Sequence, residues 1–510
     1  MSDTQLKTIH RALISVYHKE GLLEILELLV QHGVEIVSTG GTAQWIREQG
    51  FSCTDVENLT GYPSILGGRV KTLHPAVFGG ILGRRHVEED RKILHRYEIP
   101  WIDLVVVDLY PFEETLNSGA AEEEILEKID VGGVALIRAA AKNHRDVVVV
   151  PSRNDYAYLL SILRQRNYTT AEERQRLARR AFAVTAAYDT AIGAWLGSDE
   201  DVLSALPNPG APLHALRYGE NPHQKGWFLG NLAENFDQLS GKELSYNNLL
   251  DLDSGYAFLE EFYQPVWVII KHNNPCGLAT SQNPTEAFDN ALKADSKSAF
   301  GGVFLTNRPV PVSVAEKLKD FFFEILSAPD YEEEALDILS RRSQRILLRH
   351  KTFRRPSLVF RSALNGFLIQ ELDKVALGEE HLRVVTNHTP DEATWQDLRF
   401  AWKVVRHVRS NAIVLARHQM VVGVGAGHTA RIDALRHALL KAQEAGLDTC
   451  GAVLASEAFF PFADSVEMAA KAGISAIIQP GGSVRDHESI EACNRLGLAM
   501  VFTGHRHFRH

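Results

Sequence analysis

The chain has 510 residues, 45% hydrophobic and 23% charged, which is long enough for two to four globular domains. Its net charge of -10 disfavours a general nucleic-acid-binding or membrane-surface role, because both of those partners are polyanions. The four cysteines lie far apart, the N-terminus has no apolar signal core, and no apolar run approaches the ~20 residues that span a bilayer. We therefore expect a cytoplasmic globular protein that binds neither nucleic acid nor membrane.

The first part of the chain alternates between predicted strands and predicted helices. Apolar runs predict strands at 11–17, 34–41, 102–112 and 146–152, and helical spacing predicts helices at 21–33, 42–50, 121–130 and 170–197. Strands this continuously apolar are buried on both faces, which predicts a parallel sheet covered by helices. The charged, Pro- and Gly-containing segment 198–212 is typical of a linker. We place the boundary there and expect domains at 1–199 and 200–510, the second with two sub-domains.

Two polar segments of the first domain are candidate anion sites. The turn VSTGGTAQW (37–45) offers hydroxyls and amides at a helix N-terminus, which suits a phosphate, although any glycine-rich turn between a strand and a helix has this composition. In LGGRVKTLHPAVFGGIL (66–82), Arg69, Lys71, Thr72 and His74 fall within six residues. So many donors in one loop favour an anionic ligand over an ordinary surface loop.

Two other segments of this domain have equally simple structural interpretations. IDVGGVALIRAAAKNH (129–144) carries Asp130 at the start and Lys142 near the end of an apolar helix, where a capping Asp and a solvated Lys would suffice. DLYPF (108–112) ends a predicted strand, where α/β sheets place ligands. Its Tyr110 is either a proton donor or a packing residue.

The second domain contains VWVIIKHNNPCG (266–277), a buried strand that ends in two adjacent basic side chains, Lys271 and His272. Polar residues often mark the exit of a strand, so this is the simpler interpretation. The alternative is that an ammonium and an imidazole are held on a rigid platform for proton chemistry.

These segments together resemble one known family. STGGT, GGRVKTLHPAVFGG, LYPF and IDVGGVALIRAAAKNH, in this order, resemble the inosine monophosphate cyclohydrolase domain of the bifunctional purine-synthesis enzymes, whose fold is related to methylglyoxal synthase. The other half of that family is aminoimidazole carboxamide ribonucleotide (AICAR) transformylase. Its motifs follow in family order as ALRYGENPHQ, IIKHNNPCGLA, SAFGG, APDYEEEAL, RSNAIVLA, VGAGHTARID, FFPFADSV and PGGSVRDHESIEAC.

The resemblance covers nearly the whole chain and implies its fold class and its reactions. The fold would be a methylglyoxal-synthase-like parallel sheet domain followed by two cytidine-deaminase-like α/β sub-domains. The transformylase would pass a formyl group from 10-formyltetrahydrofolate to AICAR, giving formyl-AICAR and tetrahydrofolate. The cyclohydrolase would close formyl-AICAR to inosine monophosphate with loss of water. The resemblance also implies a homodimer whose subunits share the transformylase sites.

No catalytic metal is expected in this chain. A zinc deaminase needs H-x-E and P-C-x-x-C around its metal. Here His272 is followed by Asn273 and Asn274, and Ala279 stands where the second Cys after Cys276 would be required. Neither reaction that the resemblance implies needs a redox cofactor.

The resemblance also implies roles for individual residues. His272 would remove a proton from the weakly nucleophilic amine of AICAR, and Lys271 would either stabilise the oxyanion or orient the folate. Lys71, Tyr110, Asp130 and Lys142 would carry the cyclisation, with Lys71 also fixing the phosphate. The implied substrate-binding residues are Ser15, Lys19, Thr39, Gly40, Gly41, Thr42, Arg69, Thr72, Asp108, Arg217, Tyr218, Phe300, Gly301, Glu324, Asn411, Arg431, Phe459, Asp464, Ser483 and Arg506.

The chain departs from the family pattern at several nucleotide-binding positions. The usual S-V-S-D-K reads SVYHK, with Tyr17 and His18, and the Asn that usually precedes L-Y-P-F is Asp108. The usual G-x-G-Q-x-S-R carries His428 and Ala430. These changes leave open a second hypothesis, a nucleotide-binding regulatory homologue with impaired catalysis. The retained Lys-His pair argues against it, because a pure binder needs no such pair.

Overall fold

The computed structural model describes residues 6–197, 211–352, 355–375 and 378–510. The chain divides into two compact units, Met1–Pro212 and Leu213–His510. Most of the predicted linker, 198–210, lies outside the described residues, so the predicted boundary at 199/200 stays a prediction. Among the helices of the described ranges, none is long and apolar enough to cross a membrane.

The first unit is built on a five-stranded sheet in which every pair of neighbours is parallel, as predicted. Its order is β4-β3-β2-β5-β6, with bounds β2 Arg11–Val16, β3 Glu35–Ser38, β4 Thr54–Asp55, β5 Leu104–Asp108 and β6 Val148–Val150. Residues of the central strands on both faces are buried, including Leu13, Ile14, Val105 and Val106. Burial of both faces is the reason that these strands appear as unbroken apolar runs in the sequence.

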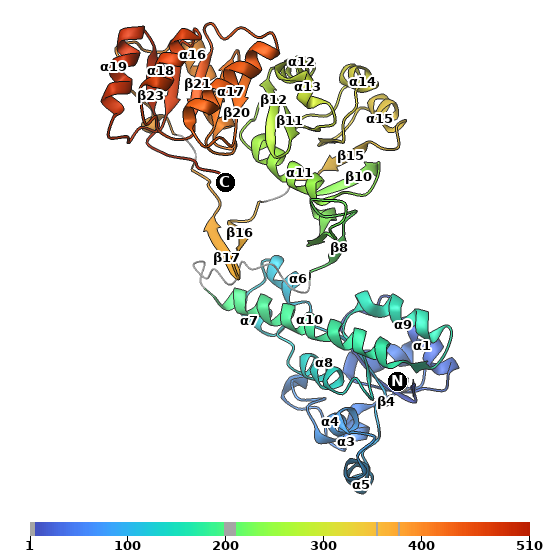
Figure 1. Ribbon diagram of the computed structural model, residues 1–510. Coiled ribbons are helices and arrows are strands. Elements are labelled where there is room, and N and C mark those ends of the chain that lie inside the picture. Colours follow the sequence, from blue (N-terminus) through green and yellow to red (C-terminus); the bar gives the residue numbers. More distant parts are fainter. Residues whose placement is uncertain (1–5, 198–210, 353–354, 376–377) are drawn as a thin grey trace. The chain divides into compact units, whose positions relative to one another are not determined.

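Helices cover this sheet, and the long α10 packs along α8 (Figure 1). The bounds are α1 Leu22–Gln31, α2 Gly40–Glu48, α3 Val56–Thr60, α4 Pro75–Leu82, α5 Glu88–Arg96, α6 Phe112–Asn117, α7 Glu122–Leu126, α8 Gly132–Lys142, α9 Tyr156–Leu163 and α10 Ala171–Leu196. A separate two-stranded sheet pairs β1 Lys7–Thr8 with β7 Tyr168–Thr169. A capping box of Thr170 and Glu173 fixes the start of α10.

The helix predicted at 121–130 is shorter than the sequence pattern suggests, because α7 ends at Leu126. The reason is a tertiary contact with α10. The hydroxyl of Tyr188 donates to the carbonyl of Lys128 (2.6 Å) and accepts from the backbone N–H of Asp130 (2.9 Å). These bonds take backbone groups that a helix would need, so the chain enters α8 as a loop that carries Asp130.

The second unit contains one twelve-stranded sheet with the order β10-β15-β14-β13-β11-β12-β20-β19-β21-β22-β23-β18. The bounds are β10 Phe236–Ser240, β11 Val266–Lys271, β12 Asn274–Thr280, β13 Val303–Thr306, β14 Ile325–Ala328, β15 Ile346–His350, β18 Arg383–Val384, β19 Ile413–Arg417, β20 Met420–Gly425, β21 Val453–Ser456, β22 Ala476–Gln479 and β23 Ala499–Phe502. Two short hairpins stand apart from it, β8 Leu213–Ala215 with β9 Trp227–Leu229, and β16 Leu358–Ala363 with β17 Gly366–Glu371.

This sheet has the same strand pattern when it is followed from either end. In each half an antiparallel hairpin (β11–β12 or β19–β20) is followed by an antiparallel neighbour, two parallel strands and an antiparallel edge strand. The halves meet through the antiparallel bridge of Ala279 with Met420. The predicted pair of α/β sub-domains is therefore two halves of one sheet.

Helices cover both faces of this sheet at corresponding places in the two halves (Figure 1). The bounds are α11 Tyr246–Leu259, α12 Pro284–Ala294, α13 Ser296–Ala299, α14 Val312–Leu318, α15 Glu333–Ser340, α16 Glu392–Val405, α17 Arg431–Glu444, α18 Asp464–Lys471 and α19 Asp486–Leu496. Along β11, Val268 and Ile270 join one core cluster and Trp267 and Ile269 another. This alternation over a fully buried strand holds β11 rigidly, and Lys271 is its last residue.

Candidate active sites

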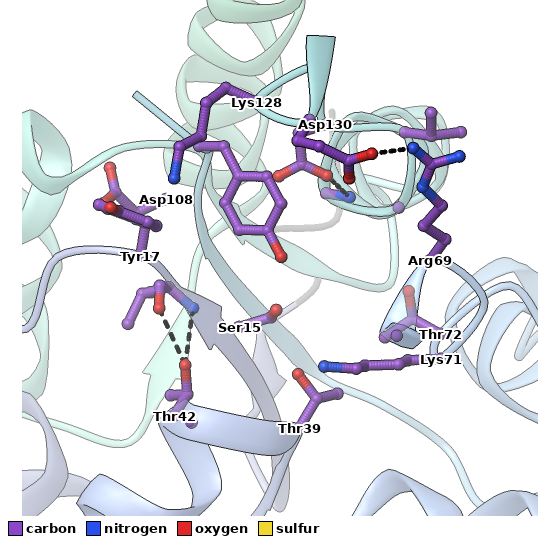
Figure 2. Close-up of a pocket in the computed structure, with 18 of the residues that line it drawn as sticks. Ser15, Tyr17, Thr39, Thr42, Arg69, Lys71, Thr72, Asp108, Lys128 and Asp130 are labelled. Atoms are coloured by element: carbon purple, nitrogen blue, oxygen red, sulfur yellow. Dashed lines mark hydrogen bonds and ion pairs between the residues drawn. The ribbon is translucent and has the colours of Figure 1, made fainter. Parts of the chain in front are cut away.

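A cavity of about 790 Å³ opens at the carboxyl ends of β2, β3 and β5 in the first unit (Figure 2). Ligand sites of parallel sheets form at this edge, because the loops that leave the strands diverge there. Eleven of the predicted residues line the cavity: Ser15, Lys19, Thr39, Gly41, Thr42, Arg69, Lys71, Thr72, Asp108, Tyr110 and Asp130. The fold thus brings predicted residues from five separate segments of the chain into one cavity.

One side of the cavity is cationic (Figure 2). Lys71 lies against the N-terminus of α2, where a Cβ added at Gly40 would be 2.9 Å from the Lys71 Nζ. Gly68 leaves room for the same side chain, because a Cβ there would be 2.5 Å from the Lys71 Cε. An ammonium beside free amides at a helix N-terminus suits a phosphate. Arg69 on this side pairs with Glu127.

Asp130 and Tyr110 form the acid–base part of the cavity. The Asp130 Oδ1 accepts a hydrogen bond from the Gly133 N–H (2.7 Å), which fixes the carboxylate at the start of α8. Burial raises the pKa of Asp130 above its ordinary value, and it also raises the pKa of the Tyr110 hydroxyl. Both groups therefore hold their protons more firmly than exposed groups of the same kind.

Lys142 is not part of this cavity. It is exposed at the last position of α8, nine residues after Gly133, which is about 14 Å along the helix axis. Its predicted role in cyclisation stays a prediction from resemblance. A charged residue of this cavity that the sequence did not predict is Lys128, whose Nζ lies 5.2 Å from the centre of the Tyr17 ring. Its place two residues before Asp130 was the available signal.

In the second unit, Lys271 and His272 occupy the tip of the β11–β12 hairpin. Lys271 pairs with Asn274 across the hairpin, and the two turn residues, His272 and Asn273, have φ values of 51° and 62°. The Asn273 N–H donates to the Asp251 Oδ1 (2.7 Å), which ties the turn to α11. The tip is therefore fixed on both sides, by the sheet and by a helix.

Lys271, Phe300, Gly301 and Phe322 form a cluster at this tip, and its two aromatic rings are exposed. The Lys271 Nζ donates to the carbonyl of Phe300 (2.8 Å), and a Cβ added at Gly301 would be 3.2 Å from it. The backbone of Gly301 in turn donates to Phe322 (2.8 Å), and Phe300 and Phe322 are 5.3 Å apart between ring centres. This places Lys271 beside a surface that an aromatic ligand would fit.

Arg217 and Tyr218 are linked to this cluster through Glu324, whose backbone N–H donates to Gly302 (3.0 Å). The Arg217 Nη2 donates to the Tyr218 hydroxyl (2.9 Å), and the guanidinium lies 4.8 Å from the centre of the Tyr218 ring. Glu324 accepts ion pairs from Arg217 (3.7 Å) and from Lys242 (2.8 Å). Lys242 was missed by the sequence reasoning, because a single Lys after a Gly carries no distinctive pattern.

The remaining predicted residues, in the other half of the sheet, do not form one cluster. Asn411 accepts from the Arg431 Nη2 (2.7 Å). Arg431 is 7% exposed, and its Nη1 donates to Glu457, with a 2.5 Å contact at Oε2. The fork of Arg431 is therefore paired with a buried carboxylate, and its predicted contact with the substrate stays a prediction. Phe459, Asp464 and Arg506 are exposed, and Ser483 is half-buried in a turn.

The direction of the strands puts the residues around Lys271 and those around Asn411 at the same edge of the sheet. The end of β11, which carries Lys271, lies at the same edge as the start of β19, which follows Asn411. Three strand spacings separate β11 from β19, which amounts to about 14 Å. Across the parts of the chain that the structure describes, no three His, Cys, Asp or Glu side chains gather as a metal site would require.

Comparison with known proteins identifies two family models in this sequence. Residues 21–135 match an MGS-like domain, and residues 140–441 match the AICARFT/IMPCHase bienzyme. Three curated relatives carry the name bifunctional purine biosynthesis protein PurH. The relative from Bacteroides thetaiotaomicron is 51% identical over 99% of both chains. Those from Aquifex aeolicus and Persephonella marina are 47% and 45% identical over 98% of this chain and 100% and 99% of their own.

Proposed function

The chain belongs to the AICARFT/IMPCHase bienzyme family, and on that premise we propose which residues carry each of its two reactions. It is a bifunctional enzyme of purine biosynthesis. It transfers a formyl group to AICAR, and it cyclises the product to inosine monophosphate with loss of water. The alternative of a catalytically impaired regulatory homologue has no support in these similarities.

We assign cyclisation to the cavity of the first unit. The observation that carries this assignment is that a single cavity joins a cationic wall to two acids whose pKa values are raised by burial. Lys71, Arg69 and the N-terminus of α2 hold the phosphate, and holding the substrate in its reactive rotamer is the main requirement, because both reacting groups belong to one molecule.

The acid–base roles follow from the chemistry of ring closure. The carboxamide nitrogen attacks the formyl carbon and loses a proton, while the formyl oxygen gains one to become a hydroxyl. This hydroxyl then leaves as water with the proton of the former formamide nitrogen, and a C=N bond forms to that nitrogen. Asp130 in its ionised form accepts the carboxamide proton, and Tyr110 donates a hydrogen bond to the departing hydroxyl. Lys128 adds a positive charge near the Tyr17 ring on the opposite wall.

The pH dependence of cyclisation tests the role of Asp130. A base must be ionised, so kcat/KM is expected to fall as the pH drops through the pKa of Asp130. Burial raises that pKa, so the fall should begin above the ordinary aspartate value of about 4. Asp130→Asn should lower kcat on the order of 10² and remove this limb of the profile. An unchanged profile in the variant would refute the assignment.

We assign formyl transfer to the cluster at the tip of the β11–β12 hairpin, with 10-formyltetrahydrofolate as the donor. The amine of AICAR loses its proton to His272 as it attacks the formyl carbon. The C–N bond to the folate then breaks, and the same proton passes to the folate nitrogen as tetrahydrofolate leaves. Lys271 is positioned by its bond to Phe300 to stabilise the oxyanion, and the rings of Phe300 and Phe322 offer a surface for the pterin. Arg217 and Tyr218 hold the nucleotide.

The reactions are assayed separately in the full-length protein. With AICAR and 10-formyltetrahydrofolate, wild type should release tetrahydrofolate and inosine monophosphate together. Asp130→Asn should release tetrahydrofolate and accumulate formyl-AICAR, which would agree with two separate sites. Loss of both products in a folded Asp130→Asn protein would contradict the assignment of the two reactions to separate sites.

Assembly, location and metal dependence complete the proposal. A homodimer in the cytoplasm that works without a catalytic metal is the form we propose. Light scattering tests the dimer, because it gives the mass in solution. Elemental analysis and assays with a chelator test the metal, and an activity lost with a stoichiometric metal ion would contradict this part of the proposal.

A further inference from the structure

Two of the positions at which the chain departs from its family pattern, 18 and 108, are in direct contact. The backbone N–H of His18 donates to the Asp108 Oδ2 (2.9 Å), and the His18 Nδ1 lies 2.7 Å from the same oxygen. The register of the sheet produces this contact, because Val16 of β2 is opposite Asp108 of β5. The two departures are therefore one structural change.

Asp108 belongs to the nucleotide cavity, whereas His18 does not line it. The Asp108 side chain is 11% exposed and lines the cavity beside Lys19 and Tyr110. Both of its hydrogen bonds from His18 go to Oδ2, which leaves Oδ1 as the oxygen with acceptor capacity for a ligand. An ionised carboxylate accepts hydrogen bonds and cannot donate them. Asp108 can therefore contact only a donor group of the nucleotide.

The charge of Asp108 needs a partner in this cavity. The cationic wall attracts a phosphate dianion, and an unpaired carboxylate on the opposite side would repel it. The His18 Nδ1 supplies a hydrogen bond to this carboxylate from behind the cavity wall. Its ring is also in edge contact with Tyr17 (4.9 Å), and its Nε2 lies 3.7 Å from the Glu114 Oε2. Lys19 is a nearby cation, and burial lowers its pKa.

We propose that His18 is a positioning residue that holds Asp108 as an acceptor for a hydroxyl or N–H donor of the bound nucleotide. This inference rests on the proposed nucleotide site in the first unit. It implies that positions 18 and 108 act as a unit. An acid at position 18 is compatible with an amide at 108, and an imidazole at 18 is compatible with an acid at 108, but two acids would face each other at hydrogen-bond distance.

A double-mutant cycle on the full-length enzyme tests this coupling. Binding of inosine monophosphate is measured by calorimetry, with cyclisation KM and kcat alongside. His18→Asp should weaken binding at least tenfold and raise KM more than it lowers kcat, because it introduces the second acid. Adding Asp108→Asn to it should bring the dissociation constant back to within about threefold of wild type. Additive losses in the double variant would overturn the proposal.

Two further variants separate positioning from simple packing. His18→Asn keeps a side-chain donor to Asp108 and should bind inosine monophosphate within about threefold of wild type. His18→Leu keeps the bulk without the donor, should bind about tenfold more weakly, and replaces His18→Asp in the cycle if that variant does not fold. Equal binding by the Asn and Leu variants would overturn the proposal.

The donor on the nucleotide is identified with an analogue. If Asp108 accepts from the ribose 2′-hydroxyl, wild type should bind 2′-deoxyinosine monophosphate about tenfold more weakly than inosine monophosphate. His18→Leu should bind the two nucleotides equally. If it accepts from an N–H group, both proteins should lose nothing with this analogue.

Failure of the proposed function has a different signature. If wild type bound no inosine monophosphate, the nucleotide site itself would be wrong. If Lys71→Met abolished binding while the His18 variants had no effect, the site would stand and only the coupling would be refuted. Formyl transfer in the same variants is the internal control.

Discussion

Two hairpins of the second unit, 271–274 and 417–420, occupy corresponding positions in the two halves of its sheet. They share the same backbone conformation. Each has two turn residues with positive φ, 51° and 62° at His272 and Asn273 and 54° and 53° at His418 and Gln419. In each, a helix carboxylate holds the turn: Asp251 accepts from Asn273, and Asp397 accepts from both His418 and Gln419. Each basic strand end faces a glycine with positive φ, Gly301 or Gly451.

The surroundings of the two hairpins differ. Lys271 contacts Phe300 and lies near Phe322, within a cluster that includes Arg217 and Tyr218. Arg417 instead pairs with an exposed acid, Asp448, at 3.8 Å. Both hairpins place a His in the left-handed region, yet only one has a cluster that suits formyl transfer. The positive φ is therefore a requirement of a two-residue turn and not evidence for catalysis.

The strongest test of this difference removes each imidazole in turn. His272→Ala should lower formyl transfer on the order of 10² or more, because a general base is lost, while cyclisation stays unchanged. His418→Ala is the matched control on the same backbone and should change formyl transfer by less than threefold. Similar losses in the two variants would mean that the hairpin conformation, and not the cluster around it, sets the activity.

A second test removes the carboxylates that hold the turns. Asp397→Ala leaves two backbone amides without an acceptor and Asp251→Ala leaves one, at about 1–3 kcal/mol of unfolding free energy for each amide. Asp397→Ala should therefore destabilise the protein more, as measured by denaturant unfolding. Only Asp251→Ala should slow formyl transfer, by about tenfold, since it loosens the Lys271–His272 tip. The opposite order of stabilities would contradict the hydrogen-bond assignment.

A third test exchanges the basic strand ends. Lys271→Arg should lower formyl transfer about tenfold, because the space beside Gly301 and Phe300 is filled by an ammonium and a guanidinium is larger. Arg417→Lys should leave both reactions unchanged and alter the unfolding free energy by no more than about 0.5 kcal/mol, as an exposed ion pair allows. A clear loss of activity in Arg417→Lys would give the second hairpin a role.

Much of the fold was predictable from the sequence because its strands are buried on both faces. The cavity of the first unit was also predictable, since its residues follow strand ends and glycine-rich turns. The ion pair of Arg431 with Glu457 could not be predicted, because the two residues lie 26 positions apart and nothing local signals the pairing. The contact of His18 with Asp108 depends in the same way on sheet register over 90 residues.

Local sequence bears on the placement of Lys142 and on where the helix before Asp130 ends. Lys142 lies twelve residues after Asp130 on the same helical pattern, so the helix rise alone separates them by more than the length of either side chain. The segment 127–130 looked helical because of its Glu and Lys content, but Tyr188 from α10 takes its backbone groups. Tertiary hydrogen bonds of this kind override local propensity.

The bridge of Ala279 with Met420 at the centre of the twelve-stranded sheet has a consequence for the ancestry of the fold. A half-length unit, with β12 as the last strand of its sheet, would expose β12 as an unpaired edge, and such edges promote association. Two copies related by a two-fold axis would cover each other's edge and close the assembly. If the gene of such a dimer were duplicated and fused, the palindromic strand order would be preserved. One of the two hairpins would then be free to diverge.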